Sequence, residues 1–583
     1  MARVEPITTQ EQRRSPATGR RRRARSERSP RWLWLVLLLV GVPTILPVAY
    51  VLISSFNDAS PGQTPVWSLA PWERVFDSAT TVDSLVVSLI LSLRVPISLG
   101  IAFLLSWMLV RFDVPGKGFI HSSLWFAFFL PVLPMTFGWQ LLLDPGYGLV
   151  NQLLMKLPFV TGPVFDLGSI PGIMFIYLTL ATVPIMAILV TPAMEALDSS
   201  YEDASAVAGA GGFTTLRRIT MPLLTPALLV AFLAGFIKSL ETFEVEELLG
   251  TPAHLFVYST RIYDLLRANP ADYPQAMALS SVLLVLLFAV ALVYRRVLAR
   301  RADISTLSGK AAGIRIRPRT PLVWAGTIVI YLSIALFLVL PFGMLIAGSF
   351  TRLFGFFFLP SPWTTRHWTQ VFTSDDFAGA MWNSIWVSLI VAVVGTVIYT
   401  LLGILFTRRR GRVVSVISVV SWLPYAIPGL LIGTAFLTIA LMTPLLTRFL
   451  TTLLPLILVL IVQAMPLGSQ MMSTSVQQLS RDLEDASSVS GASWLTTLRR
   501  VVVPLVSPMM MPVFAITFMT AMKDISATVL LASPGTNTLS LLMFKFATSS
   551  SQESAAVVGV LIAGMAFLTS LLTRMVGARL QVK

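Results

Sequence analysis

The sequence predicts an all-α membrane protein with about twelve transmembrane helices, arranged as two parallel repeats of six helices. Three observations lead to this fold class. First, 55% of the 583 residues are apolar and only 12% are charged, roughly half the charged share of a soluble domain. Second, apolar stretches long enough to cross a bilayer recur along the chain. Third, a segment of 23 residues occurs twice, with 14 identical positions.

Transmembrane segments are predicted wherever an apolar stretch of roughly 18 to 28 residues occurs. Six of them fall in each half, and an even number gives both halves the same orientation around a shared central pathway. The expected spans lie near residues 32–54, 84–110, 119–143, 170–194, 222–240 and 275–294 in the first half, and near 321–349, 384–406, 413–441, 450–470, 504–522 and 555–573 in the second.

The distribution of basic residues orients the chain in the inner (plasma) membrane. With the N-terminus in the cytoplasm, 32 Lys and Arg residues lie in cytoplasmic segments and 10 lie in outer loops. Cytoplasmic loops of membrane proteins carry such an excess, so both termini are expected in the cytoplasm. The same rule accounts for the net charge of +15, and no nucleic-acid partner is expected.

Two polar segments mark the limits of the repeats. Residues 1–31 contain ten arginines and few apolar side chains, which predicts a disordered cytoplasmic tail. Residues 298–320 predict a basic cytoplasmic linker. The first repeat is therefore expected at residues 32–297 and the second at residues 321–583.

The duplicated segment occupies residues 202–224 and 484–506 at a constant offset of 282. Each copy follows the fourth predicted span of its half, so both copies are expected in the cytoplasm. The composition predicts two short helices at an angle, with a glycine at the turn between them. The next spans are expected to begin at Pro222 and Pro504, where proline is tolerated.

This pattern of an acidic residue, small residues, a glycine and a later proline resembles the EAA loop of binding-protein-dependent ABC importer permeases. Asp203-Ala204-Ser205 and Asp485-Ala486-Ser487 carry the resemblance. The chain departs from the family pattern by Asp in place of the usual Glu and by Ser in place of the second Ala. A glutamate precedes each Asp, so the acidic function is either shared with it or displaced by one residue.

The resemblance implies the type I ABC importer permease fold for essentially the whole chain. It also implies that each loop, about residues 195–222 and 477–504, is a coupling helix that inserts into a cleft of an ATPase subunit. The ATPase-coupling residues expected on this basis are Glu202, Asp203, Ala204, Gly209, Arg217, Arg218 and Pro222 in the first loop, and Glu484, Asp485, Ala486, Gly491, Arg499, Arg500 and Pro504 in the second.

The same resemblance implies a transporter assembled from several chains. Two copies of an ABC ATPase subunit would bind ATP and Mg²⁺, and an extracytoplasmic binding protein would capture the solute. The chain contains no GxxxxGK[ST] phosphate loop, so it is expected to bind no cofactor and to be a permease subunit rather than an enzyme. It has no cysteine and three histidines, and no metal site is expected.

The transported solute is predicted from resemblance alone. The segments Leu423–Gly429, Glu241–Val245 and Thr260–Tyr263 resemble ferric-iron importers. Thiamine, sulfate, polyamine and phosphonate importers share much of this architecture and remain alternatives. An ion-gradient-driven carrier with parallel six-span halves would explain the spans, but it gives no reason for two near-identical loops.

Charged residues near the spans are candidates for the translocation pathway, because such residues are costly in a membrane. Lys238, Glu241, Lys523 and Asp524 are expected at the outer ends of the fifth spans, and Glu241 and Lys523 occupy equivalent positions of the repeat. Arg94, in the second span, either pairs with a neighbour or faces the interior. A solvated outer loop is expected for the remaining acidic residues of this region, Glu244, Glu246 and Glu247.

Overall fold

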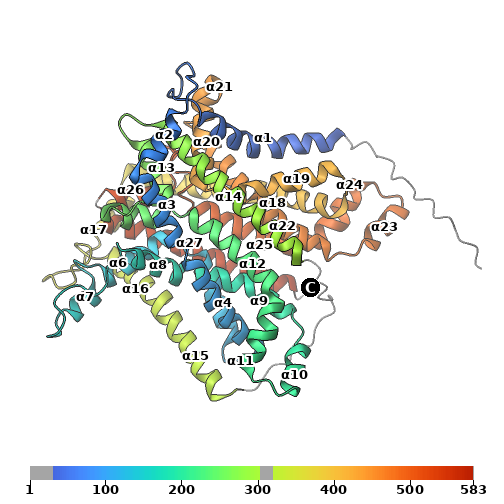
Figure 1. Cartoon of the computed structure of the whole chain (residues 1–583), viewed down its shortest axis with the longest axis horizontal. Coiled ribbons are helices and arrows are strands. Elements are labelled where there is room, and N and C mark those ends of the chain that lie inside the picture. The colour runs from blue at the N-terminus through green and yellow to red at the C-terminus, as the bar shows by residue number, and fades with distance from the viewer. Residues whose placement is uncertain (1–30, 302–318, 550, 582–583) are drawn as a thin grey trace, which may run out of the picture.

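The computed structural model describes residues 31–301, 319–549 and 551–581, which form helices and the loops between them (Figure 1). Residues 1–30 of the predicted tail and 302–318 of the predicted linker lie outside the described residues. The first half contains α1 (Arg31–Ser54), α2 (Ala70–Asp77), α3 (Ala79–Leu91), α4 (Arg94–Arg111), α5 (Lys117–Phe129), α6 (Val132–Leu143), α7 (Leu149–Leu154), α8 (Ile170–Tyr177), η1 (Leu178–Thr182), α9 (Val183–Ala196), α10 (Ser200–Val207), α11 (Gly212–Thr215), η2 (Leu216–Thr220), α12 (Met221–Leu240), η3 (Glu246–Gly250), η4 (Thr251–Ala253), α13 (Tyr258–Arg267) and α14 (Tyr273–Arg301).

The second half repeats this order with different loop lengths. It contains α15 (Pro321–Ile334), η6 (Ala335–Val339), α16 (Leu340–Ser349), α17 (Arg366–Phe372), α18 (Asp375–Arg408), α19 (Arg412–Trp422), η7 (Leu423–Ala426), α20 (Gly429–Met442), α21 (Pro444–Thr447), α22 (Leu454–Gln477), α23 (Asp482–Val489), α24 (Trp494–Thr497), η8 (Leu498–Val502), α25 (Val503–Lys523), α26 (Leu539–Thr548) and α27 (Gln552–Gln581).

The predicted all-helical membrane fold is confirmed, with one correction in each half. Within the described residues, ten helices are long and apolar enough to cross a membrane as single helical segments. The third span of each half, expected as one helix at 119–143 and at 413–441, is instead a bent pair. The pair α5–α6 bends by 101° and the pair Arg412–Ala426 with α20 bends by 105°.

Proline explains both bends. Pro131 and Pro428 stand at the breaks, and the residues before them, Leu130 and Ile427, have extended backbones with ψ of 134° and 119°. A residue before proline is pushed out of the helical region by the proline ring. The sequence contained this signal, but apolar length alone does not separate a bent span from a straight one.

The bent pair α5–α6 nevertheless connects opposite sides of the molecule. Asp113, just before α5, forms an ion pair with Arg319 at 2.8 Å, next to the start of α15. After α6, the chain reaches Tyr147, whose hydroxyl lies 3.4 Å from Gln552 Oε1 at the start of α27. The starts of α15 and α27 lie at opposite ends of the molecule (Figure 1). Counting each bent pair as one span gives twelve.

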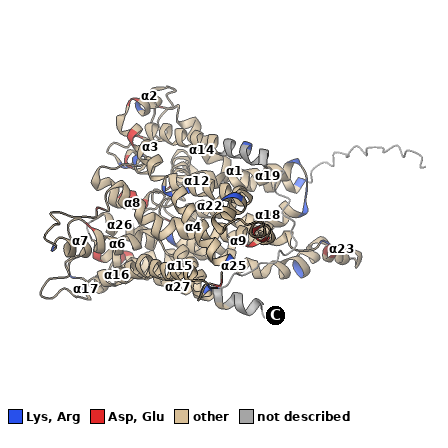
Figure 2. Cartoon of the chain, turned by 60° about the horizontal axis from the view of Figure 1, so that its bottom comes forward, with Lys and Arg blue, Asp and Glu red and all other residues tan. Residues whose placement is uncertain are grey.

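Six spans separate the two repeated loops, which therefore lie on the same side of the molecule. Figure 1 shows α10 and α11, together with α23 and α24, at the end that also carries the C-terminus. Several Lys and Arg residues, blue in Figure 2, lie at this end around α19 and α23. We call this end the loop side and the opposite end the far side.

The fifth spans begin earlier than expected. The spans predicted at 222–240 and 504–522 are continuous helices over Gly212–Leu240 and Trp494–Lys523. The π-helical turns η2 and η8 join the second helix of each loop to α12 and α25. Pro222 and Pro504 therefore do not begin a new helix but follow a π turn, a local widening common inside α-helices. The second helix of each repeated loop is thus rigidly continuous with a span.

The two halves share one core, and the first span of each half packs against the other half. Phe243 of the first half packs against Phe544 of the second, with ring centroids 5.7 Å apart, within a single buried cluster drawn from both halves. Helix α1 lies against the second half, where Leu33 and Val40 join its buried residues. Helix α16 lies against the first half, where Gly138 admits the carbonyl of Pro341 so closely that a Cβ atom would collide.

Candidate functional site

The first repeated loop is fastened to the body by a buried arginine. Arg111, the last residue of α4, places Nε 3.1 Å from Glu202 Oε1 and donates from its second guanidinium nitrogen to the carbonyl of Leu197 at 2.8 Å. Thr220 also donates a hydrogen bond to Glu202 Oε1, at 3.0 Å. The Glu202 side chain is only 2% exposed, so it points into the protein.

The second loop is held by an equivalent arginine. Arg408, the last residue of α18, lies 2.5 Å from Glu484 Oε1 and donates to the carbonyl of Leu479 at 3.1 Å. This pair is less deeply buried, with side-chain exposures of 12% and 26%. The repeat places Val502 where the first loop has Thr220. The second loop is therefore held by the same contacts but with one donor fewer.

Sequence reasoning missed both arginines. A signal was present, because Arg111 and Arg408 each end the second predicted span of their half, immediately before a short polar loop. In the structure each of the two glutamates pairs with an arginine of the second span, and their coupling to the ATPase stays a prediction. The acidic residues placed toward the outside are Asp203, which is half-buried, and Asp485, which is exposed.

Inside each loop, one hydroxyl pair joins the two short helices. Ser205 and Thr215 place their oxygens 2.9 Å apart, and Ser487 and Thr497, at the equivalent positions, place theirs 2.8 Å apart. These serines stand where the family pattern has its second alanine. The departure from the pattern thus adds a hydrogen bond that fixes the angle between the helices.

The turn between the two helices requires glycine for its backbone conformation. Gly209 has φ +82° and Gly491 has φ +78°, a left-handed conformation that costs other L-residues roughly 1–2 kcal/mol. A Cβ atom at either position would meet nothing within 4 Å. Backbone angle, and not close packing, therefore accounts for both glycines.

Each loop presents apolar side chains to solvent. Val207 is 90% exposed and Val489 is 88% exposed, although they occupy equivalent positions near the ends of α10 and α23. Three exposed apolar residues of the first loop have an exposed apolar counterpart at the repeat offset in the second loop. We call these two sets the apolar faces. They are Tyr201, Val207 and Phe213 in the first loop and Leu483, Val489 and Leu495 in the second. Contiguous exposed apolar patches mark protein–protein or membrane interaction sites.

The other predicted coupling residues lie on the outside of the loops. Those exposed are Ala204, Gly209, Arg217, Arg218 and Pro222 in the first loop, and Ala486, Gly491, Arg499, Arg500 and Pro504 in the second. The apolar faces themselves were not singled out from the sequence, although matched apolar positions in a duplicated polar loop were a usable signal.

A second group of charged residues lies where the two halves meet. Lys238, in the last turn of α12, pairs with Glu241 at 2.5 Å, and its ammonium group lies 5.5 Å from the centroid of the Tyr425 ring. Glu241 also accepts the backbone N–H of Gly429 at 2.9 Å, at the start of α20. A residue of the first half is thereby bonded to the bend of the second.

The equivalent residue of the second half reaches the opposite bend. Lys523, the last residue of α25, donates to the carbonyl of Phe128 at 2.9 Å, near the end of α5. Asp524 accepts the N–H of Ala527 at 3.0 Å and so caps the following turn. The fifth span of each half thus ends at the bend in the third span of the other half. Glu241 and Lys523, which make these two contacts, occupy equivalent positions of the repeat.

A cavity of about 120 Å³ adjoins this group. Its lining includes Lys238 of the first half and polar side chains of the second, namely Tyr425, Gln463, Thr517 and Thr520; the rest is apolar. In the described part of the chain, no group of three or more His, Cys, Asp or Glu residues could hold a metal ion.

A buried ion pair lies close to this region, in the first half. Glu246 was expected in a solvated loop, but its side chain is 0% exposed and Arg94 is 1% exposed. Arg94 lies 3.6 Å from Glu246 and over the ring of Tyr177, whose hydroxyl donates to Glu246 at 2.7 Å. Thr242 accepts from Arg94 at 2.9 Å and donates to Glu246 at 2.7 Å. The loop expectation for Glu246 was wrong because tertiary packing supplies an arginine that lies 152 residues earlier in the chain.

Comparison with known proteins gives a family match for part of the second half. Residues 399–582 match the family of binding-protein-dependent transport system inner membrane components. The first half lies outside this match. The first half carries the same loop with the same anchor, hydroxyl pair and turn.

Curated relatives are distant. A putative ferric transport system permease protein of Haemophilus influenzae is 27% identical over 61% of this chain and 56% of its own length. A ferric transport system permease protein of Actinobacillus pleuropneumoniae is 26% identical over 61% and 51%. A putative 2-aminoethylphosphonate transport system permease protein of Salmonella typhimurium is 25% identical over 44% and 96%. The chain thus spans about half the length of the ferric relatives it matches.

Solved structures give a weaker likeness. A chain of a bacterial ABC transporter involved in the import of alginate is 17% identical, with a TM-score of 0.38, and the match covers 44% of this chain and 95% of that one.

Proposed function

We propose, from the family match of residues 399–582, that the chain is the membrane-spanning permease of an ATP-driven importer, with both termini in the cytoplasm. One observation carries the proposal: two equivalent loops on one side of the molecule, each anchored inward by an Arg–Glu pair and each turned outward by an apolar face. Two such loops fit two copies of an ABC ATPase subunit, which bind ATP and Mg²⁺. A binding protein delivers the solute on the far side.

The anchors explain how motion would pass from the ATPases to the membrane. Each loop is tied by its arginine to the end of a second span, and its second helix continues without a break into a fifth span. A push on the apolar face therefore moves two spans together and tilts one half against the other. An ion-gradient-driven carrier has no use for such a pair of loops, and we place it second.

Ferric iron is the solute we propose first. The ferric relatives and the resemblance of Leu423–Gly429 and Glu241–Val245 to ferric importers support it. The phosphonate relative keeps phosphonate as an alternative, and thiamine, sulfate and polyamine importers share the architecture. A permease pathway does not have to hold its solute tightly, so the scarcity of His and Cys does not oppose iron.

Uptake of labelled ferric iron by cells carrying the chain, its ATPase and its binding protein tests this function. We expect uptake that requires ATP and is lost when Gly209 and Gly491 are both replaced by Val, because a β-branched residue does not adopt the required φ. ATP-dependent uptake of labelled phosphonate, sulfate, thiamine or polyamine without iron uptake would retain the permease and reject iron. Uptake that follows the proton gradient at constant ATP would reject the importer.

We propose that Lys238, Glu241, Lys523 and Asp524 border the translocation pathway and that the two cross-half contacts form its gate. Glu241 bonded to Gly429 and Lys523 bonded to Phe128 hold the bends of both third spans. Relative motion of the halves has to break both contacts before the cavity beside Lys238 can open.

Replacing Glu241 by Ala tests the gate. The substitution leaves the N–H of Gly429 without its acceptor, and a net hydrogen bond contributes about 1 kcal/mol, equivalent to about a fivefold shift between two states. We therefore expect about fivefold higher ATP hydrolysis without binding protein in liposomes, with weaker stimulation by binding protein. Lys545→Met, which removes a far-side ion pair that is exposed and lies within one half, is the matched control. Unchanged hydrolysis in Glu241→Ala would contradict the gate.

A further inference from the structure

A cavity of about 380 Å³ separates α15 from the first half. It is bounded by α4, α5 and the π-helical turn η1 on one side and by α15 and η6 on the other. Most of its lining residues are apolar side chains of these elements and of the start of α9.

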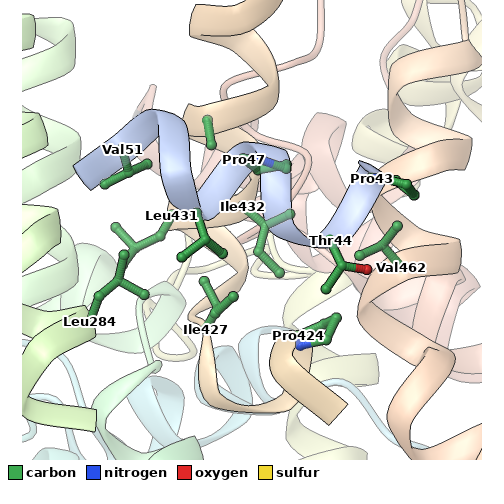
Figure 3. A pocket seen from close by; sticks show the side chains of 12 residues that line it. Pro43, Thr44, Pro47, Val51, Leu284, Pro424, Ile427, Leu431, Ile432 and Val462 are labelled. Carbon is green, nitrogen blue, oxygen red and sulfur yellow. The ribbon is translucent and has the colours of Figure 1, made fainter. Parts of the chain in front are cut away.

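Helices α1 and α15 are the first spans of their halves, and each lies against the bent third span of the opposite half. The space beside α1 that is lined by Pro47, Leu431 and Ile432 measures only about 10 Å³ (Figure 3). The cavity beside α15 is much larger.

The lining of the cavity is apolar apart from the hydroxyls of Ser123, Thr179 and Ser333. Ser123 and Thr179 donate to backbone carbonyls of their own helices, those of Phe119 and Phe175, at 3.0 and 2.9 Å. A lining of this kind resembles the engineered apolar cavities of roughly 150 Å³ that stay dry and take up apolar molecules. An empty space of this size would leave its lining side chains without contacts on one side.

The cavity opens toward the bilayer and not toward the proposed translocation pathway. Toward the loop side it is closed by the buried cluster of Leu109, Val114, Ile120 and Val323 and by the stacked rings of Phe119 and Tyr331, 5.8 Å apart. Yet Leu104 and Val329, which line it, are 54% and 61% exposed. Both lie within spans, so the surface they face is the hydrocarbon of the bilayer.

We propose that the acyl chain of a membrane phospholipid occupies this cavity and wedges α15 against the first half. A chain entering from the bilayer meets a largely apolar lining drawn from α4, α5, η1, α9, α15 and η6. The proposal depends only on the membrane location and not on the transported solute.

Native mass spectrometry of the purified full chain tests the lipid site. Ile330→Trp fills the cavity from α15, and Ser333→Phe fills it from a neighbouring position one turn away. Ile328→Trp is the matched control, because Ile328 lies on the same helix, is 63% exposed and does not line the cavity. After identical detergent washes, we expect the unmodified chain and Ile328→Trp to retain one phospholipid more than the two filled variants.

Equal numbers of retained phospholipids in all four proteins would overturn the proposal, as would an unmodified chain that is washed free of lipid. If Ile330→Trp does not fold, Ser333→Phe decides the outcome by the same count. Spin-labelled phosphatidylcholine in liposomes gives an independent reading, with one motionally restricted lipid per protein lost in the filled variants and retained in the control.

Discussion

Replacement of both Val207 and Val489 by Asp is expected to separate the permease from its ATPase. Both side chains are almost fully exposed, so the substitution does not disturb the folded chain. Burying a valine in a partner contributes about 1.5–3 kcal/mol, and every 1.4 kcal/mol is tenfold in affinity. We therefore expect ATPase binding to weaken about tenfold for each loop and about 100-fold for both, with loss of uptake.

The measurement is the affinity of the purified ATPase for the permease in detergent, together with uptake in cells. Phe159→Asp is the matched control, because Phe159 is 78% exposed but lies in the loop between α7 and α8 on the far side. The single variants should each retain one functional loop and give intermediate binding. If the double variant binds the ATPase as tightly as the control does, the apolar faces are not the docking surface.

The sequence was sufficient for the features that depend on local composition. Apolar length located the spans, and the duplicated segment located both loops with the glycines at their turns. The prolines Pro131 and Pro428 left open whether these spans are kinked or broken, because a span of normal length and apolarity is compatible with either form. Only the tertiary packing decides which form is adopted.

Long-range pairing was the part that the sequence could not supply. Glu202 and Glu484 were expected to share the acidic function of the family motif, and the sequence did not reveal their partners Arg111 and Arg408, which are more than 70 residues away. For Arg94 the sequence left pairing open, but it did not identify Glu246 as the partner. A charged residue that becomes buried needs a partner of opposite charge. The fold alone determines which residue becomes that partner.

Replacement of Arg94 by Met is expected to destabilise the chain more than any surface substitution. The variant leaves Glu246 fully buried with only the hydroxyls of Tyr177 and Thr242, and removing one member of a buried ion pair costs about 3–5 kcal/mol. The midpoint of thermal unfolding in detergent should fall clearly below that of the unmodified chain. The exposed ion pair of Lys545 and Asp376 gives the control, since such pairs contribute about 0–1 kcal/mol.

The decisive variant removes the whole network at once. At the repeat offset, Val459 and Thr528 replace Tyr177 and Glu246 in the second half, and Val391 lies as far before Arg408 as Arg94 lies before Arg111. All three are fully or almost fully buried, so the same architecture folds without the charges. Replacing a buried ion pair by apolar residues of similar volume is often neutral or stabilising.

Arg94→Met combined with Tyr177→Phe and Glu246→Leu should therefore recover most of the unfolding midpoint lost by the single variant. The network adjoins Glu241 through the short turn between α12 and η3, so uptake in this triple variant separates two roles. Recovered stability with lost uptake would mean that the charges position the gate. A triple variant as unstable as Arg94→Met would contradict the argument, because it would show that the first half depends on the charges for folding itself.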